Sequence, residues 1–527
     1  MWIWLAVMLA ALVFRPLLPI DETRYVSVAW EMWRHGDFLV PHLNGVPYSH
    51  KPPLFFWMIH AGWWLFGVNA WTARLTAPIF GLLDLFLTAY LGRLLWPDKH
   101  GVKELAPFVL FGTLLWMVFS TTTMFEMTET FFVLVAVVGV VHVACGKTWL
   151  GWGLVGLGLA AGMLTKGPVV MVFILPCVLL APWWSKGGRV ISWWRWFSGA
   201  LIALGLGIGL ALAWALPAAR AGGPDYKRAI LWTQTAGRVV RSFAHGEPLW
   251  WYLALLPVIL FPWSLYVPIW KQPAGERLDA GRRLCLSWGV SGLVLLSLVS
   301  GKQVYYVLPL LPAVALLVAR SGDCLFQPPE RKFRWPVGLV FILFGVALTL
   351  LPALSGHVRE VLVFKEMSPA WGMFPAAIGV GLVFFRPARA GSFLVALCVA
   401  CAFLVILIHL GPFRILKPRY DVTAMAEKIG QLQRRGNRVA HFGKYDGQYH
   451  FPGRLERPLE ILMSPKAVQD WAEKHPEGYI VLYCKECDKD FSNGAEFVQP
   501  YRGRWAALWK AKALEASPDV LLQIQGA

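Results

Sequence analysis

Acids, bases and phenols gather in a few short segments that interrupt long apolar runs. Asp21 and Glu22 directly follow the first apolar run, and Arg24 and Tyr25 come next. A carboxylate at a membrane surface can act as a general base on a hydroxyl, while Lys and Arg can hold a phosphate. Such a set suits sugar transfer from a lipid phosphate. Its other members are Tyr48, His50, Lys51, Glu126, Lys166, Arg238, Arg241, His245, Lys302, Tyr305 and Tyr306.

The composition places this chemistry in a membrane. Hydrophobic residues make up 57% of the 527 residues, charged residues only 15%, and the mean hydropathy is +0.53. Soluble domains contain about 25% charged residues, so a typical soluble enzyme is excluded. The net charge of +18 fits an excess of Lys and Arg in inner loops better than nucleic-acid binding. The sequence lacks a GxxxxGK[ST] loop, which favours a donor carried by the membrane.

Thirteen apolar segments predict a polytopic α-helical membrane protein of about thirteen transmembrane helices. The segment 54–67 is too short for a span, and we interpret it as an interfacial helix. The thirteen segments are 1–20, 71–96, 105–125, 130–146, 149–165, 168–184, 196–219, 250–270, 284–299, 304–319, 335–354, 371–385 and 391–411.

Loop charge predicts the orientation. With the N-terminus inside, the inner loops and their edges carry 17 basic residues, including Arg93, Lys99 and Lys147, against six acidic ones, and the outer loops are mixed in sign. Every turn that holds a residue of the polar set then faces outward. Ionisable groups at a membrane boundary are costly and tend to line a polar cavity, so we expect an outer site. Any single Lys or Arg can instead snorkel, and Asp21 with Glu22 can simply end a helix.

The C-terminal part differs in kind. We predict a transmembrane domain over 1–414, with outer loops 21–70 and 220–249, and an outer α/β domain over 415–527. Within the latter, 477–484 and 505–511 are typical of strands, and 423–435 and 464–474 of helices. Ser464 and Pro465 are a typical helix start. Cys484 and Cys487 either form a local disulfide in an oxidising compartment or stay unpaired.

Four separate segments carry a family resemblance. DETRYVSVAWEMWRHGDFLVPHLNGVPYSHKPPLFFW (21–57) resembles the first outer loop of polyprenyl-phosphate-sugar glycosyltransferases of the GT-C class. The lipid A aminoarabinose transferases and bacterial relatives of protein O-mannosyltransferases match this pattern best. The other three segments are MLTKGPVVMVFILP (163–176), HGEPLWWYLALLPVILFPW (245–263) and SGKQVYYVLPLLPAVALL (300–317).

The resemblance implies a membrane bundle with a periplasmic C-terminal domain, an undecaprenyl-phosphate-sugar donor and inversion at the anomeric carbon. It implies that Asp21 is the key carboxylate, with Glu22 as its neighbour. Arg24, Lys51 and Tyr306 match residues expected at the donor phosphate, with Tyr48 near the lysine. Glu126 takes the place of a second outer acid that is usually Asp.

Two departures leave the sugar and any metal unassigned. His50 stands where aminoarabinose transferases often carry Glu, and WTQTAGR before Arg238 replaces a His-containing segment. The sequence assigns no cofactor and leaves a divalent metal open.

The favoured interpretation is a bacterial inner-membrane glycosyltransferase that acts on lipid A or lipopolysaccharide. In this interpretation, Asp21 or Glu126 is the base that deprotonates an acceptor hydroxyl. If the acceptor is a phosphate, it is already anionic and needs no base. Alternatives are transfer to protein Ser/Thr or another envelope glycan, a lipid or solute transporter, and an assembly subunit. A transporter is disfavoured because we find no inverted halves and the polar residues gather at one face.

Overall fold

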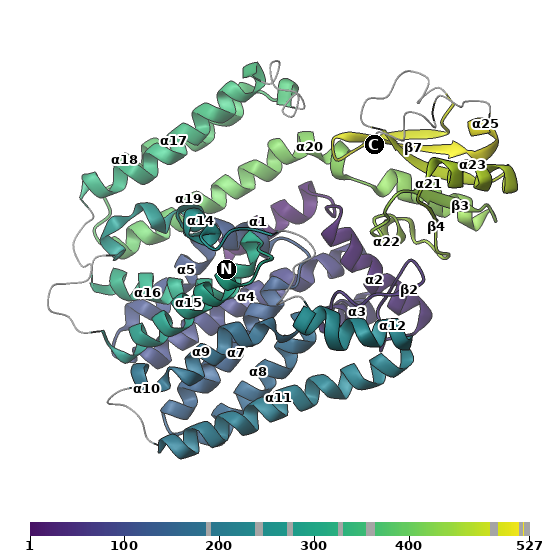
Figure 1. The fold of residues 1–527 in the computed structure, drawn as a ribbon. Coiled ribbons are helices and arrows are strands. Elements are labelled where there is room, and N and C mark those ends of the chain that lie inside the picture. The colour runs from purple at the N-terminus through teal and green to yellow at the C-terminus, as the bar shows by residue number, and fades with distance from the viewer. Residues whose placement is uncertain are drawn as a thin grey trace.

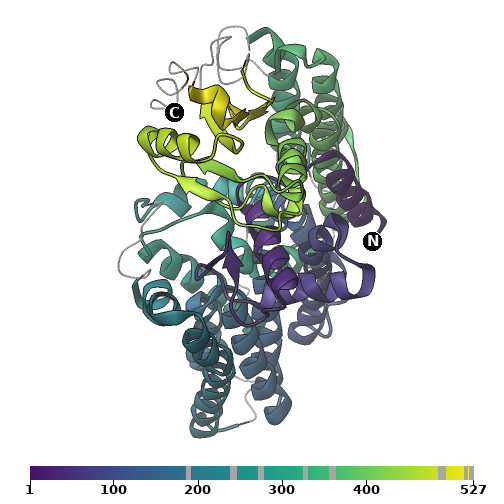
Figure 2. The same ribbon diagram turned by 90° about the vertical axis from the view of Figure 1, so that its right-hand side faces the viewer.

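The computed structural model describes residues 1–185, 191–237, 246–270, 278–324, 330–354, 364–484, 494–515 and 520. Many of its helices lie side by side and run roughly left to right across Figure 1. A small sheet with its own helices lies at the right-hand end of this bundle, and Figure 2 views the molecule from that end. The predicted class, a polytopic helical membrane protein with a small C-terminal α/β unit, is confirmed.

Seven helical stretches of the described chain are long and apolar enough to cross a membrane. α7 is the most enclosed, with 83% of its span buried, whereas the spans of α11 and α17 are 11% and 22% buried and face outward. The seven are α4 (Ala70–Leu95), α7 (Glu126–Ala144), α8 (Thr148–Lys166), α11 (Trp193–Ala221), η5 (Val304–Leu310) with α16 (Leu311–Cys324), α17 (Arg331–Leu354) and α19 (Ala390–Leu410).

Two predicted spans are wrong as continuous helices. Residues 105–125 form α5 (His100–Gly112) and α6 (Leu114–Ser120), which are bent by 72°. At the break, the Leu114 amide donates to the carbonyl of Phe261, a partner far away in sequence. Residues 250–270 form α14 (Trp251–Ile259) and the short 3-10 turns η3 (Trp263–Leu265) and η4 (Val267–Trp270). Proline at 257, 262 and 268 removes amide donors along this stretch, which favours short turns.

The remaining predicted segments are also helical, but several are too short for a straight span, so the total of thirteen stays a prediction. They are α1 (Trp2–Phe14), η1 (Pro168–Val170) with α9 (Met171–Leu179) and α10 (Ala181–Trp184), α15 (Ala280–Leu298), and η7 (Pro369–Gly372) with α18 (Met373–Phe384). Before the undescribed stretch 238–245 lie α12 (Gly223–Arg228) and the π-helix η2 (Ala229–Gly237).

The first outer loop is folded rather than open. It consists of α2 (Asp21–His35), a hairpin of β1 (His42–Leu43) and β2 (Val46–Pro47), and α3 (Leu54–Phe66) at the expected interfacial segment. Asn44 and Gly45 both have positive φ, as a two-residue hairpin turn requires. The buried Glu31 carboxylate accepts hydrogen bonds from both of their amides and so ties the turn to α2.

The C-terminal sheet unit, which we define as α21 to α25, contains a five-stranded mixed sheet in the order β4-β3-β5-β7-β6. β3 is parallel to β4 and β5, and β7 is antiparallel to β5 and β6. α20 (Pro412–Tyr420) leads into the unit. Its elements are α21 (Thr423–Arg434), β3 (Val439–Phe442), α22 (His450–Gly453), β4 (Glu460–Leu462), α23 (Pro465–Lys474), β5 (Tyr479–Cys484), β6 (Phe497–Tyr501), β7 (Arg504–Lys510) and α25 (Ala511–Glu515).

The predicted helices and strands of this unit are confirmed, whereas β3, β4 and β6 were not predicted. Ser464 caps α23 as expected, because its hydroxyl accepts the Ala467 amide. Cys484 is disulfide-bonded. Cys487 lies outside the described residues, so the Cys484–Cys487 pairing stays a prediction.

The sheet unit is anchored on the first outer loop. The Ser27 hydroxyl donates to the Gly447 carbonyl at 2.7 Å and accepts the Phe451 amide at 3.0 Å. The Asn44 side chain makes two hydrogen bonds with the backbone of Leu459, at 3.0 and 2.8 Å. These contacts place the sheet unit directly over the start of α2, where the polar residues begin.

Candidate functional site at the outer end of the bundle

A buried charged triad lies between α7 and α8. The Lys166 ammonium is 3.0 Å from a carboxylate oxygen of Glu126 and 2.8 Å from one of Glu129. The three side chains are only 7%, 3% and 0% exposed. One cation faces two carboxylates, and within the described structure the other oxygen of each carboxylate has no hydrogen-bond partner. The triad thus pairs one basic side chain with two acidic ones and, among the described residues, keeps two acceptor oxygens without a partner.

Helix geometry explains the triad. Glu126 and Glu129 are three residues apart in the first turn of α7, so they share one face. Lys166 is the last residue of α8, and both placements suit the dipoles of the two helices. The helices pack closely: a Cβ on Gly139 would lie 2.6 Å from a backbone oxygen of α8, and one on Gly158 would lie 2.6 Å from a backbone oxygen of α7.

A second charged cluster lies at the start of α2. Arg24 forms an ion pair with Asp21 and lies 3.2 Å from the carboxylate of Asp446 in the sheet unit. The Tyr25 hydroxyl donates to Asp21 at 3.3 Å. Burial opposes the charge of Arg24, but the phenols of Tyr48 and Tyr25 and the two carboxylates raise its pKa above the ordinary value. Arg24 therefore stays cationic. The Asp21 side chain is 42% exposed and so remains accessible.

Aromatic rings join the two clusters. The Phe125 ring lies 4.8 Å from that of Tyr25, and the Lys51 ammonium lies 5.2 Å from the Phe125 centroid. On the other side, Lys166 lies 4.8 Å from the Tyr306 ring and 5.9 Å from that of Tyr305. Cation–π contacts of this kind hold ammonium groups over apolar surfaces. The predicted donor-phosphate residues thus come from three separate segments but belong to one contact network.

The neighbours of Lys51 also pack into this region. Tyr48 and His50 stack with ring centroids 5.2 Å apart, and Tyr48 packs edge-on against Phe56. The segment that departs from the family pattern is therefore held by aromatic contacts.

Other predicted site residues are not in this network. Glu22 turns inward, where it pairs with the buried Arg15 and accepts the Thr123 amide at 2.6 Å. Burial opposes ionisation of Glu22, but Arg15 and the backbone amides of Thr123 and Leu18 lower its pKa. Glu22 is thus positioned to anchor α2. The Lys302 ammonium donates to the Glu247 carbonyl at 2.8 Å and joins two loops. Arg238, Arg241 and His245 lie outside the described residues.

Two residues of the network had no assigned role in the predicted site. Glu129 lies in the same predicted outer turn as Glu126, and its i+3 spacing from Glu126 was the signal for a shared helix face. Asp446 carried no such signal, because it is 422 residues from Arg24 and reaches it only through docking of the sheet unit. Among the described residues, no group of three or more His, Cys, Asp and Glu side chains is arranged to hold a metal ion.

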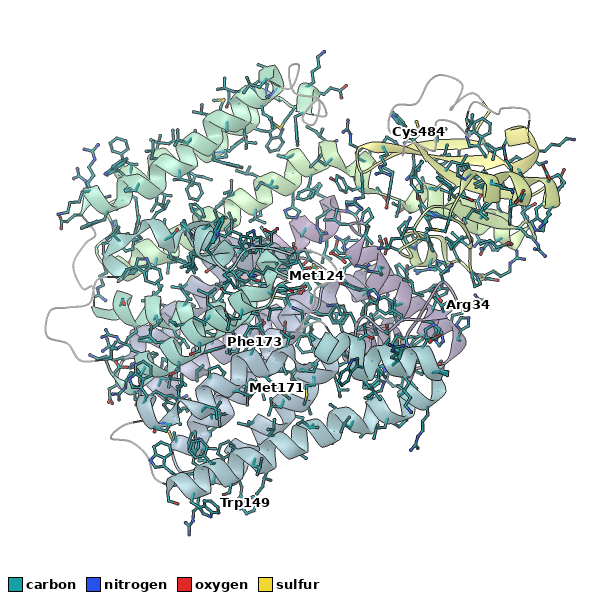
Figure 3. The ribbon with its side chains drawn as sticks, in the orientation of Figure 1. Arg34, Met124, Trp149, Met171, Phe173 and Cys484 are labelled. Carbon is teal, nitrogen blue, oxygen red and sulfur yellow. The ribbon has the colours of Figure 1, made fainter. Side chains whose placement is uncertain are left out.

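The network lies toward the sheet-unit end of the bundle. In Figure 3, Met124, just before Phe125, lies toward the centre, and Arg34 of α2 lies at the right beneath the sheet unit. Trp149, near the start of α8, lies at the lower left. Fold and site together define a multi-pass membrane protein with acids, bases and phenols collected at the end that the sheet unit covers.

Known proteins resemble this chain in sequence and in fold. Residues 50–214 match the family described as dolichyl-phosphate-mannose-protein mannosyltransferase. The chain is 30% identical to the undecaprenyl phosphate-α-4-amino-4-deoxy-L-arabinose arabinosyl transferase of Erwinia tasmaniensis over 71% of its own length and 69% of the relative. A transferase of the same name, numbered 2, from Pseudomonas fluorescens is 29% identical, over 68% and 65%. The crystal structure of ArnT from Cupriavidus metallidurans bound to undecaprenyl phosphate superimposes with a TM-score of 0.76 at 17% identity, over 96% of each chain.

The chain belongs to the family of undecaprenyl phosphate-aminoarabinose arabinosyl transferases, which confirms the resemblance stated from its motifs. The matched region spans 65% of the Pseudomonas fluorescens relative's length, just under two thirds. The likeness to ArnT supports the same overall fold across nearly the whole chain.

Proposed function

We propose that this protein is an integral-membrane glycosyltransferase that moves a sugar from an undecaprenyl-phosphate donor to lipid A or lipopolysaccharide. The relatives' names indicate 4-amino-4-deoxy-L-arabinose as the first sugar to test. The observation that carries the proposal is the network itself: an accessible carboxylate, Asp21, shares Arg24 with Asp446 beside a phenol- and lysine-lined region.

In the proposed mechanism, Arg24, Lys51 and Tyr306 hold the donor phosphate. The acceptor oxygen attacks the anomeric carbon, the bond from that carbon to the phosphate oxygen breaks, and undecaprenyl phosphate leaves with the electron pair. Inversion follows from this single displacement. Fixed cationic and hydroxyl donors stabilise the charge that develops on the leaving phosphate.

Asp21 is the better candidate for the base. Its side chain is 42% exposed, whereas Glu126 is 3% exposed and already paired with Lys166. If the acceptor is a hydroxyl, its proton passes to Asp21. If the acceptor is an anionic phosphate, Asp21 only orients it, because no proton has to be removed. Glu126 and Glu129 then serve mainly to position Lys166 beside Tyr306.

Transfer to protein Ser/Thr is the second candidate function. The match of residues 50–214 to protein mannosyltransferases favours it. The two candidates share the donor chemistry and differ in the acceptor, so one acceptor panel separates them.

The test is in vitro transfer. Purified protein is incubated with undecaprenyl-phosphate-4-amino-4-deoxy-L-arabinose and lipid A, and the masses of the products are measured by mass spectrometry. We expect a pentosamine increment with the unaltered chain, little with Lys51→Ala or Asp21→Asn, and full activity with Lys474→Gln on the exposed face of α23. Near-normal turnover in Lys51→Ala would contradict the phosphate-binding role. No transfer to lipid A, with transfer to a Ser/Thr peptide, would favour the second function.

We also propose a bacterial inner-membrane location, with the N-terminus cytoplasmic and residues 415–527 periplasmic. The support is that the network and the sheet unit share one end of the bundle. Cys145, an exposed free thiol in the α7–α8 turn, offers a test. In intact spheroplasts it should react with a membrane-permeant maleimide and not with an impermeant one. Labelling by the impermeant reagent would reverse the orientation.

A further inference from the structure

The C-terminal sheet unit contains a cavity of about 410 Å³ that belongs to neither charged cluster. Three of its seven lining residues are basic, two are tyrosines and none is acidic. A lining of this composition suits an anion. The lining residues are Phe442, Gly443, Lys444, Tyr483, Tyr501, Arg502 and Arg504.

The cavity lies where sheet topology favours a binding site. β3 and β5 are adjacent and parallel. The strand that follows β3 in the chain, β4, lies on one side of this pair, and the strand that follows β5, β6, lies on the other side, beyond β7. The carboxyl edge between two such strands opens into a crevice, because their connections diverge. The lining residues Phe442, Gly443 and Lys444 come from the end of β3 and its loop, and Tyr483 comes from the end of β5.

One basic residue is held at some cost in backbone energy. Arg502 and Gly503 form the two-residue turn between β6 and β7, with φ of 48° and 80°. Asn, Asp and Gly tolerate such a position better than Arg does. An unfavourable conformation that places a cation at a cavity motivates a functional hypothesis for that residue. Arg502 also lies beside the Tyr501 phenol.

The floor of the cavity is rigid. The buried Tyr483 hydroxyl is 3.0 Å from a ring nitrogen of His441 and 2.7 Å from the Tyr449 hydroxyl, and it accepts a bond from Gln448 at 3.2 Å. A satisfied buried network of this kind fixes the position of each member. The cavity is therefore shaped before any ligand arrives.

The cavity is coupled to the proposed transfer site through one carboxylate. The same oxygen of Asp446 lies 3.5 Å from the Lys444 ammonium and 3.2 Å from the Arg24 guanidinium. Arg24 in turn pairs with Asp21. One residue, Asp446, thus lies between Lys444, which lines the cavity, and Arg24, which we assign to the donor phosphate.

We propose that this cavity binds a phosphate of the acceptor glycolipid, through Lys444, Arg502 and Arg504, while another part of the acceptor reaches Asp21. This inference rests on the proposed function and names the acceptor's anchoring site within it. Lys and Arg bind phosphate by charge-assisted hydrogen bonds, and Arg does so with two parallel donors.

The test uses the full chain with Lys444→Gln and Arg502→Asn combined. Asn is favoured at the left-handed turn position, so this variant should fold at least as well as the unaltered chain. The matched control is Lys466→Gln with Lys474→Gln on α23, which removes the same charge from exposed positions that do not line the cavity. Two readouts are taken: transfer kinetics, and binding of protein to bisphosphorylated lipid A, dephosphorylated lipid A and phosphatidylglycerol in detergent micelles.

We expect the acceptor KM to rise about tenfold in the cavity variant, as for the loss of one or two charged contacts. The kcat should stay unchanged, and the control variant should match the unaltered chain in every readout. The unaltered chain should prefer bisphosphorylated lipid A over both other lipids, and the cavity variant should lose that preference. An unchanged acceptor KM, or no preference in the unaltered chain, overturns the inference. If the unaltered chain transfers no sugar to lipid A, the proposed function fails, and the binding arm still decides whether the cavity takes the phosphate.

Discussion

Replacement of Lys166 by Met tests the buried triad most directly. The substitution conserves the length of the side chain and removes a cation that lies 2.8 and 3.0 Å from two carboxylates. Loss of one partner from a buried ion pair costs about 3–5 kcal/mol, because the other charge is left uncompensated. Here two carboxylates are left together, so we expect the upper end, about 5 kcal/mol. At roughly 2 °C per kcal/mol for a large chain, Tm in detergent should fall by about 10 °C.

Two variants make the comparison specific. Lys302→Met also removes a buried lysine, but its partner is the neutral carbonyl of Glu247, so the cost should be about 1–3 kcal/mol. The triple variant Lys166→Met, Glu126→Gln and Glu129→Gln removes all three charges and should regain most of the lost stability.

The assay is thermal unfolding of the purified protein, followed by size-exclusion chromatography after heating at a series of temperatures. The reasoning is refuted if Lys166→Met unfolds within about 3 °C of the unaltered chain, which is under 2 kcal/mol on the same scale. It is also refuted if the triple variant is no more stable than Lys166→Met, because uncompensated charge would then not be the cause.

Three further predictions concern the sheet unit. Burial lowers the pKa of His441 to about 4 from an ordinary 6.5. Between pH 6.5 and pH 4, the unfolded chain therefore binds a proton at this imidazole and the folded chain does not, so acidification favours unfolding. The contribution of His441 to the free energy of unfolding should be complete above pH 6.5 and should fall by about 3 kcal/mol on acidification to pH 4. Limited proteolysis at a series of pH values should show a weaker pH dependence for His441→Gln than for the unaltered chain. Asp446→Asn leaves Arg24 with one carboxylate fewer and should lower the donor KM about fivefold, as for a partly buried pair worth about 1 kcal/mol; a raised donor KM would argue that Asp446 positions Arg24 instead. Ser464→Ala removes the cap on the Ala467 amide and should cost about 1 kcal/mol in urea unfolding of the unit, and an unchanged midpoint would contradict the cap.

The existence of the helices was predictable, because hydropathy over a span is a local property of the chain. Every predicted apolar segment contains helix, and the short segment 54–67 is α3. Their continuity was not predictable. At the bend between α5 and α6, the Leu114 amide donates to the Phe261 carbonyl, and a segment cannot indicate a partner so far away in sequence.

The location of the polar residues was predictable to a similar depth. Asp21, Arg24, Lys51, Glu126, Lys166 and Tyr306 were singled out by type and by position at the ends of apolar runs, and the structure brings them into one network. The pairing within that network was not predictable. Asp21 and Glu22 are adjacent in sequence, yet one stays accessible beside Arg24 and the other is buried against Arg15.

The sequence by itself determined which segments are apolar, which polar residues end them, and which residues can cap or turn the chain. These are properties of single residues and their near neighbours. Only the tertiary structure decided that Asp446 reaches Arg24, that Lys166 serves two carboxylates, and that three cations of the sheet unit surround one cavity. Those outcomes depend on how helices and sheet pack across hundreds of residues, where close approach and the burial of charge select the partners.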